Sequence, residues 1–305
     1  MRLLLLGCTG LVGRELVPQL LAEGHTLTIV SRQQRQLAGV TCLQSDPSRP
    51  ESWAAGSALQ QALEQAEGVV NLAGEPIAEQ RWTPAHLEVL HRSRIDTTRH
   101  LVAAINASDA PPQVLVSASA VGYYGTSESA SFNEDSPAGS DVLAKLCEQW
   151  EAAAKQVNAS TRLVITRIGI VLAPDGGALG KMLPIFRAGF GGPIGSGQQW
   201  MSWIDRSDLC RVFSQSLENS SYSGVFNLVA PKPVKMSRFC SQLGSTLSRP
   251  SLLPVPPFLL KLLLGDGASV VLDGQQVLPS RLQNVGFTFK YPDLASSLAH
   301  LLLDQ

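Results

Sequence analysis

The chain has 305 residues, enough for one large domain or two smaller ones around a sizeable core. Apolar residues make up 44% and charged residues 16%, a composition that excludes a disordered protein and indicates a folded globular one. The formal net charge is -1, and no segment carries a dense run of lysine and arginine. This distribution excludes a nucleic-acid-binding surface and leaves a small molecule as the expected partner of a monomer or homodimer.

The cysteines and histidines show no metal-ligand or disulfide pattern. The five cysteines are scattered, odd in number and never spaced as C-x-x-C, which favours free thiols in a reducing, cytoplasmic environment. The five histidines have no metal-ligand spacing, so we expect no bound metal.

Two apolar stretches could be mistaken for membrane segments. The N-terminal "MRLLLLGCTG" is too short for a signal peptide and runs into a glycine loop. The later "LLPVPPFLLKLLLG", which starts at Leu252, contains three prolines and Lys261 and is too short to span a bilayer. It is typical of a core or an interface, and a peripheral membrane contact is the alternative.

The first half of the chain alternates short apolar runs with segments of helical spacing. Uniformly apolar strands between helices are typical of a parallel sheet that helices bury on both faces. The sequence therefore predicts an α/β fold of the Rossmann type, a doubly wound parallel sheet. In chain order the predicted elements are strand 2–6, helix 13–24, strand 26–30, strand 68–73, helix 87–105, strand 112–119, helix 142–156 and strand 162–172.

The pattern changes after about residue 172. Residues 173–199 are rich in glycine and predict excursions over a cleft, whereas "GVFNLVA" at 224–230 predicts a strand that returns to the main sheet. We therefore expect a dinucleotide-binding domain at 1–172 that includes the returning strand. Residues 173–223 and 231–305 are expected to form a smaller, mixed substrate-binding lobe.

The segment "GCTGLVG" has the strongest functional pattern. Its three glycines follow the first strand and precede the first helix, where they permit a tight turn, a close approach of a pyrophosphate and close packing of helix on strand. A purely structural turn is the alternative. The expected cofactor contacts in this loop are Gly7, Thr9, Gly10, Leu11, Val12 and Gly13.

The residues after the second strand indicate which dinucleotide binds. An NAD site usually has an acidic residue here, but this chain has Ser31, Arg32 and Arg35, which suit the 2′-phosphate of NADP(H). The alternative is that both arginines are solvated. Asp46 follows the next short strand and is either a contact for the adenine amine or an exposed loop residue.

The motifs "GCTGLVG", "NLAGE", "RSRIDTT" and "SASAVGYYG" together resemble the short-chain dehydrogenase/reductase superfamily, on its extended, epimerase-like side. The segments "GGPIGSGQQWMSWI" and "LDGQQVLPSRLQNVGFTFKYPDL" resemble a subgroup described as nucleoside-diphosphate-sugar epimerases or SulA-like cell-division proteins. The resemblance implies further cofactor contacts, with ordinary core packing or a solvated helix face as the alternative. These contacts are Leu72, Ala73, Gly74, Arg94, Ser117 and Val171.

One departure from the superfamily concerns the catalytic pair. Its enzymes normally carry Tyr-x-x-x-Lys, in which the lysine lowers the pKa of the tyrosine. Here Leu143 and Cys147 occupy those positions, and Lys145 projects from another face of the helix. The remaining catalytic candidates are a serine that the resemblance assigns to the substrate oxygen and two tyrosines that either transfer a proton or only form a pocket wall. They are Ser119, Tyr123 and Tyr124.

A second departure concerns the substrate. Met201 stands where related nucleotide-sugar enzymes often carry a diphosphate-binding arginine, and Asp205 replaces a usual histidine. Nucleotide sugars are therefore doubtful substrates. Two hypotheses follow: an NADP(H)-dependent oxidoreductase or epimerase acting on a small carbonyl or hydroxyl compound, or a catalytically inactive NADPH-binding regulatory protein.

Overall fold

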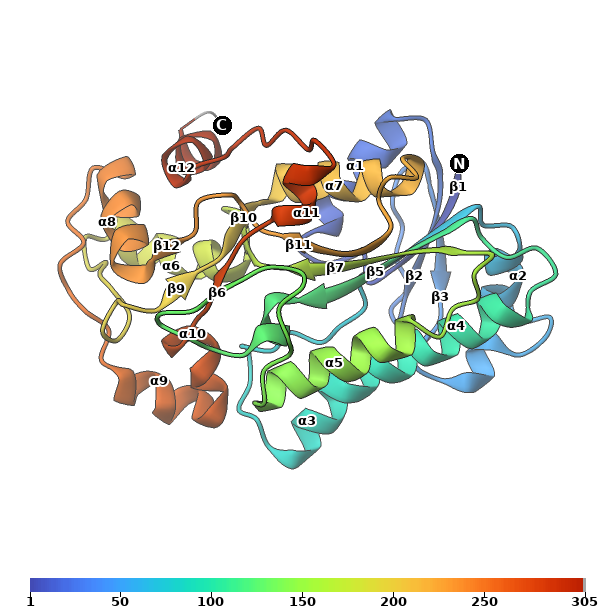
Figure 1. Ribbon diagram of the computed structural model, residues 1–305, viewed down its shortest axis with the longest axis horizontal. Helices are drawn as coiled ribbons and strands as arrows, with labels where there is room; N and C mark the ends of the chain where they lie inside the picture. The colour runs from blue at the N-terminus through green and yellow to red at the C-terminus, as the bar shows by residue number, and fades with distance from the viewer. Residues whose placement is uncertain (304–305) are drawn as a thin grey trace.

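At the centre of the molecule lies a seven-stranded parallel sheet with the strand order β11-β7-β5-β4-β1-β2-β3 (Figure 1). The structure is a computed structural model and describes residues 1–303. This strand order is that of a doubly wound Rossmann sheet with one added edge strand, so the predicted fold class is confirmed. The strands are β1 (Arg2–Leu6), β2 (Thr26–Ser31), β3 (Val40–Gln44), β4 (Gly68–Asn71), β5 (Val114–Ala120), β7 (Arg162–Ile168) and β11 (Gly224–Leu228).

Helices cover both faces of this sheet because its strands are apolar on both sides. In β1, Leu3 and Leu5 belong to a core shared with helices α1 (Gly13–Ala22) and α7 (Arg206–Glu218). Leu4 and Leu6 point the other way, into a core shared with α2 (Ala58–Glu64) and α4 (Thr97–Ala107). Each fully buried leucine contributes about 2 kcal/mol relative to an exposed one. Helix α5 (Val142–Ala154) runs beside α4.

Two predicted elements are interrupted. The helix predicted at 87–105 is α3 (Pro84–His91) and α4, joined by the π-helical turn η2 (Arg92–Asp96). The strand predicted at 162–172 is β7 followed by β8 (Ile170–Leu172), with Gly169 between them. A Cβ at Gly169 would lie 2.3 Å from the carbonyl oxygen of Ser202, so only glycine lets the chain turn out of the sheet there. Strand β8 then pairs with β10 (Trp203–Asp205).

A second core lies at the end of the molecule away from the N-terminus (Figure 1). The glycine-rich segment 173–199, predicted as excursions, contains helix α6 (Gly177–Arg187). Helix α6 packs with α8 (Met236–Thr246) and α12 (Leu294–Leu302) around the buried Trp203. The remaining elements of this region are β9 (Trp200–Met201), β12 (Val234–Lys235), α9 (Pro257–Leu264), η4 (Gly265–Ala268) and α10 (Ser269–Leu272).

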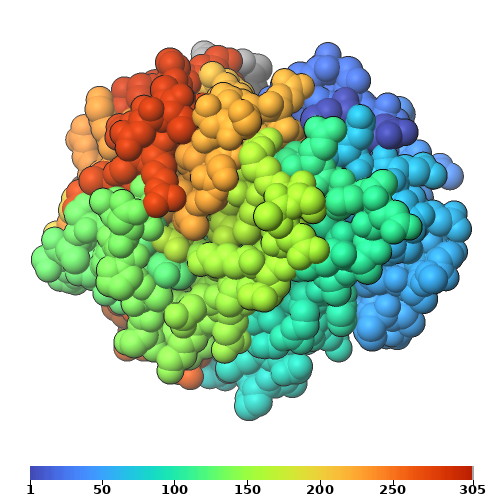
Figure 2. All heavy atoms as spheres, turned by 45° about the vertical axis from the view of Figure 1, so that its right-hand side comes forward, coloured from blue at the N-terminus to red at the C-terminus, as the bar shows by residue number. Residues whose placement is uncertain are grey.

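The C-terminal part of the chain returns to the main sheet. Strand β13 (Gln276–Val277) pairs with β6 (Ser131–Phe132), and Figure 2 shows the red C-terminal segment directly above the green residues. After helix α11 (Ser280–Asn284), Phe287 packs into the core formed by α1 and α7. Helix α7 and residues 280–287 were predicted to belong to the lobe but pack on the main sheet. The division into a 1–172 domain and a separate lobe therefore stays a prediction.

Within residues 1–303, no helix is both long enough and apolar enough to cross a lipid bilayer.

The short 3-10 helices are η1 (Pro50–Trp53), η3 (Val121–Tyr124) and η4.

Candidate cofactor and active site

The three glycines between β1 and α1 have different surroundings. Gly7 has φ 73°, and a Cβ there would lie 2.5 Å from the carbonyl oxygen of Leu72. A Cβ at Gly13 would lie 1.8 Å from the carbonyl oxygen of Cys8, whereas a Cβ at Gly10 would meet nothing within 4 Å. Gly7 and Gly13 therefore allow close packing, and Gly10 leaves open space beside the loop.

Helix α1 begins at this open space without a side-chain cap. Its N-cap residue is Val12, which offers no hydrogen-bonding side chain to the first N–H groups. Uncapped N–H groups and the positive end of the helix dipole favour an anion. The geometry around Gly10 thus fits the pyrophosphate of a dinucleotide.

An ion-pair cluster holds the segment after β8 over the start of α1. Asp175 accepts hydrogen bonds from Nη1 of Arg14 at 3.0 Å and from Nη1 of Arg206 at 2.6 Å. Arg206 also donates to Glu15 at 2.7 Å and to the carbonyl oxygen of Leu11 at 3.3 Å. The predicted contact Leu11 is therefore fixed by residues from the second half of the chain.

The end of β2 presents two basic side chains and one hydroxyl. Arg32 is largely exposed, and its Nη2 lies 3.4 Å from Oε2 of Glu75. Arg35 donates to Gln33 at 2.9 Å, and the hydroxyl of Ser31 accepts the N–H of Gln33. Neither arginine is held by a short ion pair with a carboxylate, so both guanidinium groups are available to a phosphate.

Asp46 lies close to these basic groups. Its carboxylate accepts hydrogen bonds from the N–H and hydroxyl of Ser48. Partial burial alone would raise the pKa of Asp46, but the bonds from Ser48 and the charges of Arg32 and Arg49 outweigh it and lower the pKa. Asp46 is therefore an ionised acceptor near Arg32.

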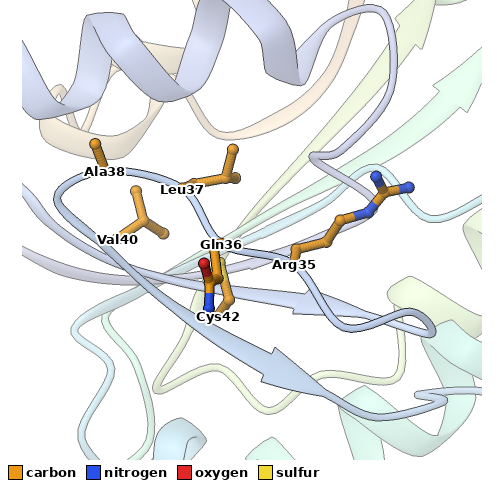
Figure 3. A pocket seen from close by; sticks show the side chains of 6 residues that line it. All are labelled: Arg35, Gln36, Leu37, Ala38, Val40 and Cys42. Atoms are coloured by element: carbon orange, nitrogen blue, oxygen red, sulfur yellow. The ribbon is translucent and has the colours of Figure 1, made fainter.

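A shallow pocket of about 380 Å³ lies beside the loop between β2 and β3 (Figure 3). The side chain of Arg35 extends away from the small apolar residues of the pocket (Figure 3). The lining residues are Arg35, Gln36, Leu37, Ala38, Val40 and Cys42. The pocket thus includes Arg35, one of the two arginines predicted to bind the 2′-phosphate.

The ends of β4 and β5 bring further predicted contacts together. Asn71 fixes the chain after β4, because its Oδ1 accepts the N–H of Ala73 and its Nδ2 donates to Thr98. Leu72 follows Asn71 and packs against the core of the sheet. Ser117, opposite Asn71 in β5, is fully buried, and its hydroxyl has no hydrogen-bond partner in the described chain.

Arg94 supports the loop that follows β4. Its guanidinium lies against Gly74, donates to the carbonyl oxygen of Glu75 at 2.7 Å and stacks on the ring of Trp150 at 5.4 Å. Burial lowers the pKa of Arg94. The guanidinium of Arg94 shapes the loop at 74–75. A contact between Arg94 and a cofactor stays a prediction. A contact between a cofactor and Val171, which lies in β8, also stays a prediction.

Ser119 and Tyr124 belong to one buried hydrogen-bond network. The hydroxyl of Ser119 donates to Oε1 of Glu151 at 2.8 Å, and Arg167 binds both oxygens of the same carboxylate. Nη1 of Arg167 donates to the hydroxyl of Tyr124 at 2.9 Å, and Tyr124 donates to Oδ1 of Asn227 at 2.6 Å. Burial raises the pKa of Tyr124 to about 12. The protons of Ser119 and Tyr124 are thus both directed at protein acceptors.

Tyr123 differs from its neighbour. Its ring is half-buried and lies over the guanidinium of Arg167, with 3.4 Å between the ring centroid and Cζ. The ring also meets the edge of Tyr124, with 5.4 Å between centroids. No group of the described chain hydrogen-bonds the hydroxyl of Tyr123, so this phenol is open to a ligand.

The positions of the missing catalytic pair face the turn that carries the tyrosines. A Cβ at Gly122 would lie 3.5 Å from Cβ of Leu143 and 3.9 Å from Sγ of Cys147. Burial raises the pKa of Cys147 to about 12, so the thiol is neutral at pH 7. Lys145 is exposed, on another face of α5, as the helical spacing predicts.

Asp205 does not face a ligand. It is fully buried and caps helix α7, accepting the N–H of Ser207 at 2.9 Å and the hydroxyl of Ser297 at 2.6 Å. Met201 is also buried, in the second core. The carboxyl group that stands in place of the usual histidine is thus used inside the protein.

Sequence reasoning missed Arg167 and Asn227. Arg167 lies in the otherwise apolar segment "RLVITRI", and a charged residue in a buried strand is a signal for a buried partner. Asn227 has no comparable signal.

The sequence matches the NAD dependent epimerase/dehydratase family over residues 3–228 and a domain of unknown function, DUF1731, over residues 255–301. The chain belongs to the NAD-dependent epimerase/dehydratase family, within the short-chain dehydrogenase/reductase class that its motifs resemble.

Relatives support this membership over nearly the whole length. The "Epimerase family protein SDR39U1 homolog, chloroplastic" of Arabidopsis thaliana is 46% identical over 97% of this chain and 85% of its own. The crystal structure of human epimerase family protein SDR39U1 (isoform 2) with NADPH is 36% identical, with a TM-score of 0.90 and 99% of each chain covered. The nucleoside-diphosphate sugar epimerase from Corynebacterium glutamicum is 30% identical with a TM-score of 0.78, over 99% of this chain and 58% of its own.

Proposed function

We propose that this protein binds NADP(H) and acts as an oxidoreductase or epimerase on a small carbonyl or hydroxyl compound. The open space at Gly10 beside an uncapped helix supports dinucleotide binding. Arg32 and Arg35 at the end of β2 support NADP(H) over NAD(H). The human relative, 36% identical to this chain, was crystallised with NADPH, and this likeness supports the choice of cofactor.

Residues from four parts of the sheet would hold the cofactor. The N–H groups at the start of α1 suit the pyrophosphate, and Arg32 and Arg35 suit the 2′-phosphate. Asp46, as an ionised acceptor, suits the adenine amine. The further proposed contacts are Leu72, Ala73, Gly74, Arg94, Ser117 and Val171.

Tyr123 is the proposed proton-transfer group, and its free hydroxyl is the observation on which the catalytic proposal depends. Bound NADPH supplies a hydride, so a reduced carbonyl needs a proton from the protein. Ser119 and Tyr124 already donate theirs to Glu151 and Asn227. The oxygen of Ser119 still accepts a hydrogen bond, so it can orient a substrate hydroxyl.

The substrate would lie between the tyrosine turn and the proposed lobe at 173–223 and 231–305. The five free cysteines, four of them buried, suit a reducing compartment such as the cytoplasm, which we propose as the location.

The second candidate is an NADPH-binding regulatory protein without turnover. The observation that favours it is the pair Leu143 and Cys147 against the tyrosine turn, since neither is a cation that could lower the pKa of a phenol.

Absorbance of NADPH in the presence of a panel of carbonyl compounds tests the proposal, with thermal unfolding as the binding assay. We expect NADPH to raise the melting temperature of wild type and of Tyr123→Phe equally. Wild type should oxidise NADPH with at least one compound, and Tyr123→Phe should do so about a hundredfold more slowly. The matched Tyr124→Phe variant should keep turnover within about threefold of wild type, because its phenol faces inward.

Stabilisation by NADPH with no oxidation by any compound would assign the regulatory role instead. No stabilisation at millimolar NADPH would overturn both candidates.

A further inference from the structure

The short helix α9 exposes an apolar surface to solvent. None of the residues of α9 is buried, and Phe258, Leu262 and Leu263 are each about two-thirds exposed, at 66%, 69% and 67%. The preceding Leu252 is 82% exposed. A helix in a globular protein normally buries an apolar stripe, so the exposed apolar face of the helix "PFLLKLLL" is left uncovered by the described chain.

A second apolar segment continues this surface along the chain. Residues 189–195 run beside residues 250–257, because the N–H of Leu253 donates to the carbonyl oxygen of Gly191 and that of Val255 to Pro193. Phe190, 64% exposed, precedes this contact. Seven of the eleven large exposed apolar side chains of residues 1–303 lie in these two segments, and an eighth lies close before them in the sequence, in helix α6; we call these eight the leucine surface. They are Ile185, Phe190, Leu252, Leu253, Phe258, Leu259, Leu262 and Leu263.

The segments that carry the leucine surface hold basic residues and no acids, and acids near them include Asp266, just after α9, and Glu79, 3.7 Å from Lys181. Residues 176–204 and 231–265 contain seven of the 24 lysines and arginines of the chain and none of the 25 aspartates and glutamates. Arg187, Arg249 and Lys261 are exposed, and none of them forms an ion pair within the described residues. An apolar surface with unpaired cations is complementary to an interface of acyl chains and anionic headgroups.

We propose that the leucine surface docks on a membrane that contains anionic lipids. Helix α9 would lie in the plane of the interface, with Phe258, Leu262 and Leu263 at the headgroup–acyl boundary. Lys261 and Arg249 would lie at the level of the lipid phosphates, since long basic side chains reach the interface while their stems stay apolar. This inference goes beyond the proposed function and does not depend on it.

A second copy of the chain fits the surface less well. A two-fold dimer places the same patch on both subunits, so the unpaired Arg187, Arg249 and Lys261 would lie in an apolar interface close to their own copies. An anionic bilayer offers the opposite charge to all three.

Vesicle flotation tests the proposal with the full chain. Wild type should float with phosphatidylcholine vesicles that contain phosphatidylglycerol, at least about tenfold more than with phosphatidylcholine alone, because each cation at the surface adds about fivefold. High salt should weaken this binding. Phe258→Ser with Leu262→Ser, and separately Arg249→Glu with Lys261→Glu, should each lower flotation at least about tenfold.

The controls are Val142→Ser, an apolar residue on α5 that is 53% exposed, and Lys145→Glu, an exposed cation on the same helix. Both should float like wild type, and thermal unfolding should show that every variant is folded. If the serine variant does not fold, the charge-reversal variant alone decides the outcome.

Absence of wild-type protein from the floated anionic vesicles would overturn the proposal. So would light scattering that shows a dimer which the serine variant dissociates, because the surface would then belong to a second copy. Equal loss of flotation in the Lys145→Glu control would overturn it as well.

Discussion

Arg167 binds Glu151 through two hydrogen bonds, from Nε to Oε1 at 2.7 Å and from Nη2 to Oε2 at 2.9 Å. Their side chains are only 3% and 1% exposed. The pair joins the sheet to helix α5 and orients the side chains of Ser119, Tyr123 and Tyr124, so the geometry of the candidate site depends on it.

Replacing Glu151 with Gln should lower the free energy of unfolding by about 3 kcal/mol, because a buried guanidinium is left without its counter-charge. Urea denaturation measures this change. Lys155→Ala is the control, since Lys155 contacts the same carboxylate at 3.5 Å from a half-exposed position, and it should cost no more than about 0.5 kcal/mol. Equal effects of the two variants would contradict this account.

Two glycine variants should separate folding from binding in the loop after β1. Gly13→Ala should destabilise the protein by more than about 2 kcal/mol, because its Cβ would overlap the carbonyl of Cys8. Gly10→Ala should leave stability within about 0.5 kcal/mol but weaken NADPH binding at least about tenfold, because its methyl group fills the open space. Urea denaturation and calorimetry would show this, and a fully stable Gly13→Ala would refute it.

Replacing Arg32 with Ala should weaken NADPH binding about tenfold to hundredfold and leave NADH binding unchanged. A charge-assisted hydrogen bond to the 2′-phosphate has a free energy of that size, and NADH has no such phosphate. Titration calorimetry with both cofactors measures it. Arg99→Ala, an exposed arginine on α4, should change neither affinity. A parallel loss of NADH affinity would argue against the assigned phosphate site.

The pH dependence of stability should contain a contribution from Asp205. Burial raises the pKa of Asp205 to about 6 from its ordinary 3.8. Between these values the native state holds a proton that the unfolded chain has lost, so the free energy of unfolding falls as the pH rises from about 4 to about 6.

Replacing Asp205 with Asn removes the titration and keeps a helix-capping oxygen. Relative to this variant, wild type should therefore become less stable over that pH window, as measured by urea denaturation at each pH. The exposed Asp109→Asn should show no such trend. A constant difference between wild type and Asp205→Asn from pH 4 to 6 would show that the carboxyl titrates normally.

Local patterns predicted the sheet and the glycine loop because periodicity and glycine spacing act over a few residues. The exposure of Lys145 followed in the same way from the helical repeat. The break at Gly169 could not be predicted, since it depends on the backbone of Ser202, which reaches it only after folding.

The candidate site was less accessible to sequence reasoning. Tyr124 and Asn227 are 103 positions apart, and Arg206 and Leu11 are 195 apart. Tyr124 and Asn227 meet because both lie at or just beyond the carboxyl ends of strands of the main sheet, and Arg206 meets Leu11 because helix α7 packs against helix α1; no pattern near any of these residues encodes either contact. The sequence therefore identified the tyrosines but not which of their hydroxyls stays free.

The segregation of cations into residues 176–204 and 231–265 also affects how the molecule moves. The net charge is only -1, yet residues 1–172 carry 13 lysines and arginines against 17 aspartates and glutamates, whereas residues 173–305 carry 11 against 8. Such an uneven charge distribution orients the protein as it approaches a charged partner. A negatively charged surface is therefore attracted to the end that carries helix α9, whereas Arg32 and Arg35 give the proposed cofactor site a positive charge of its own.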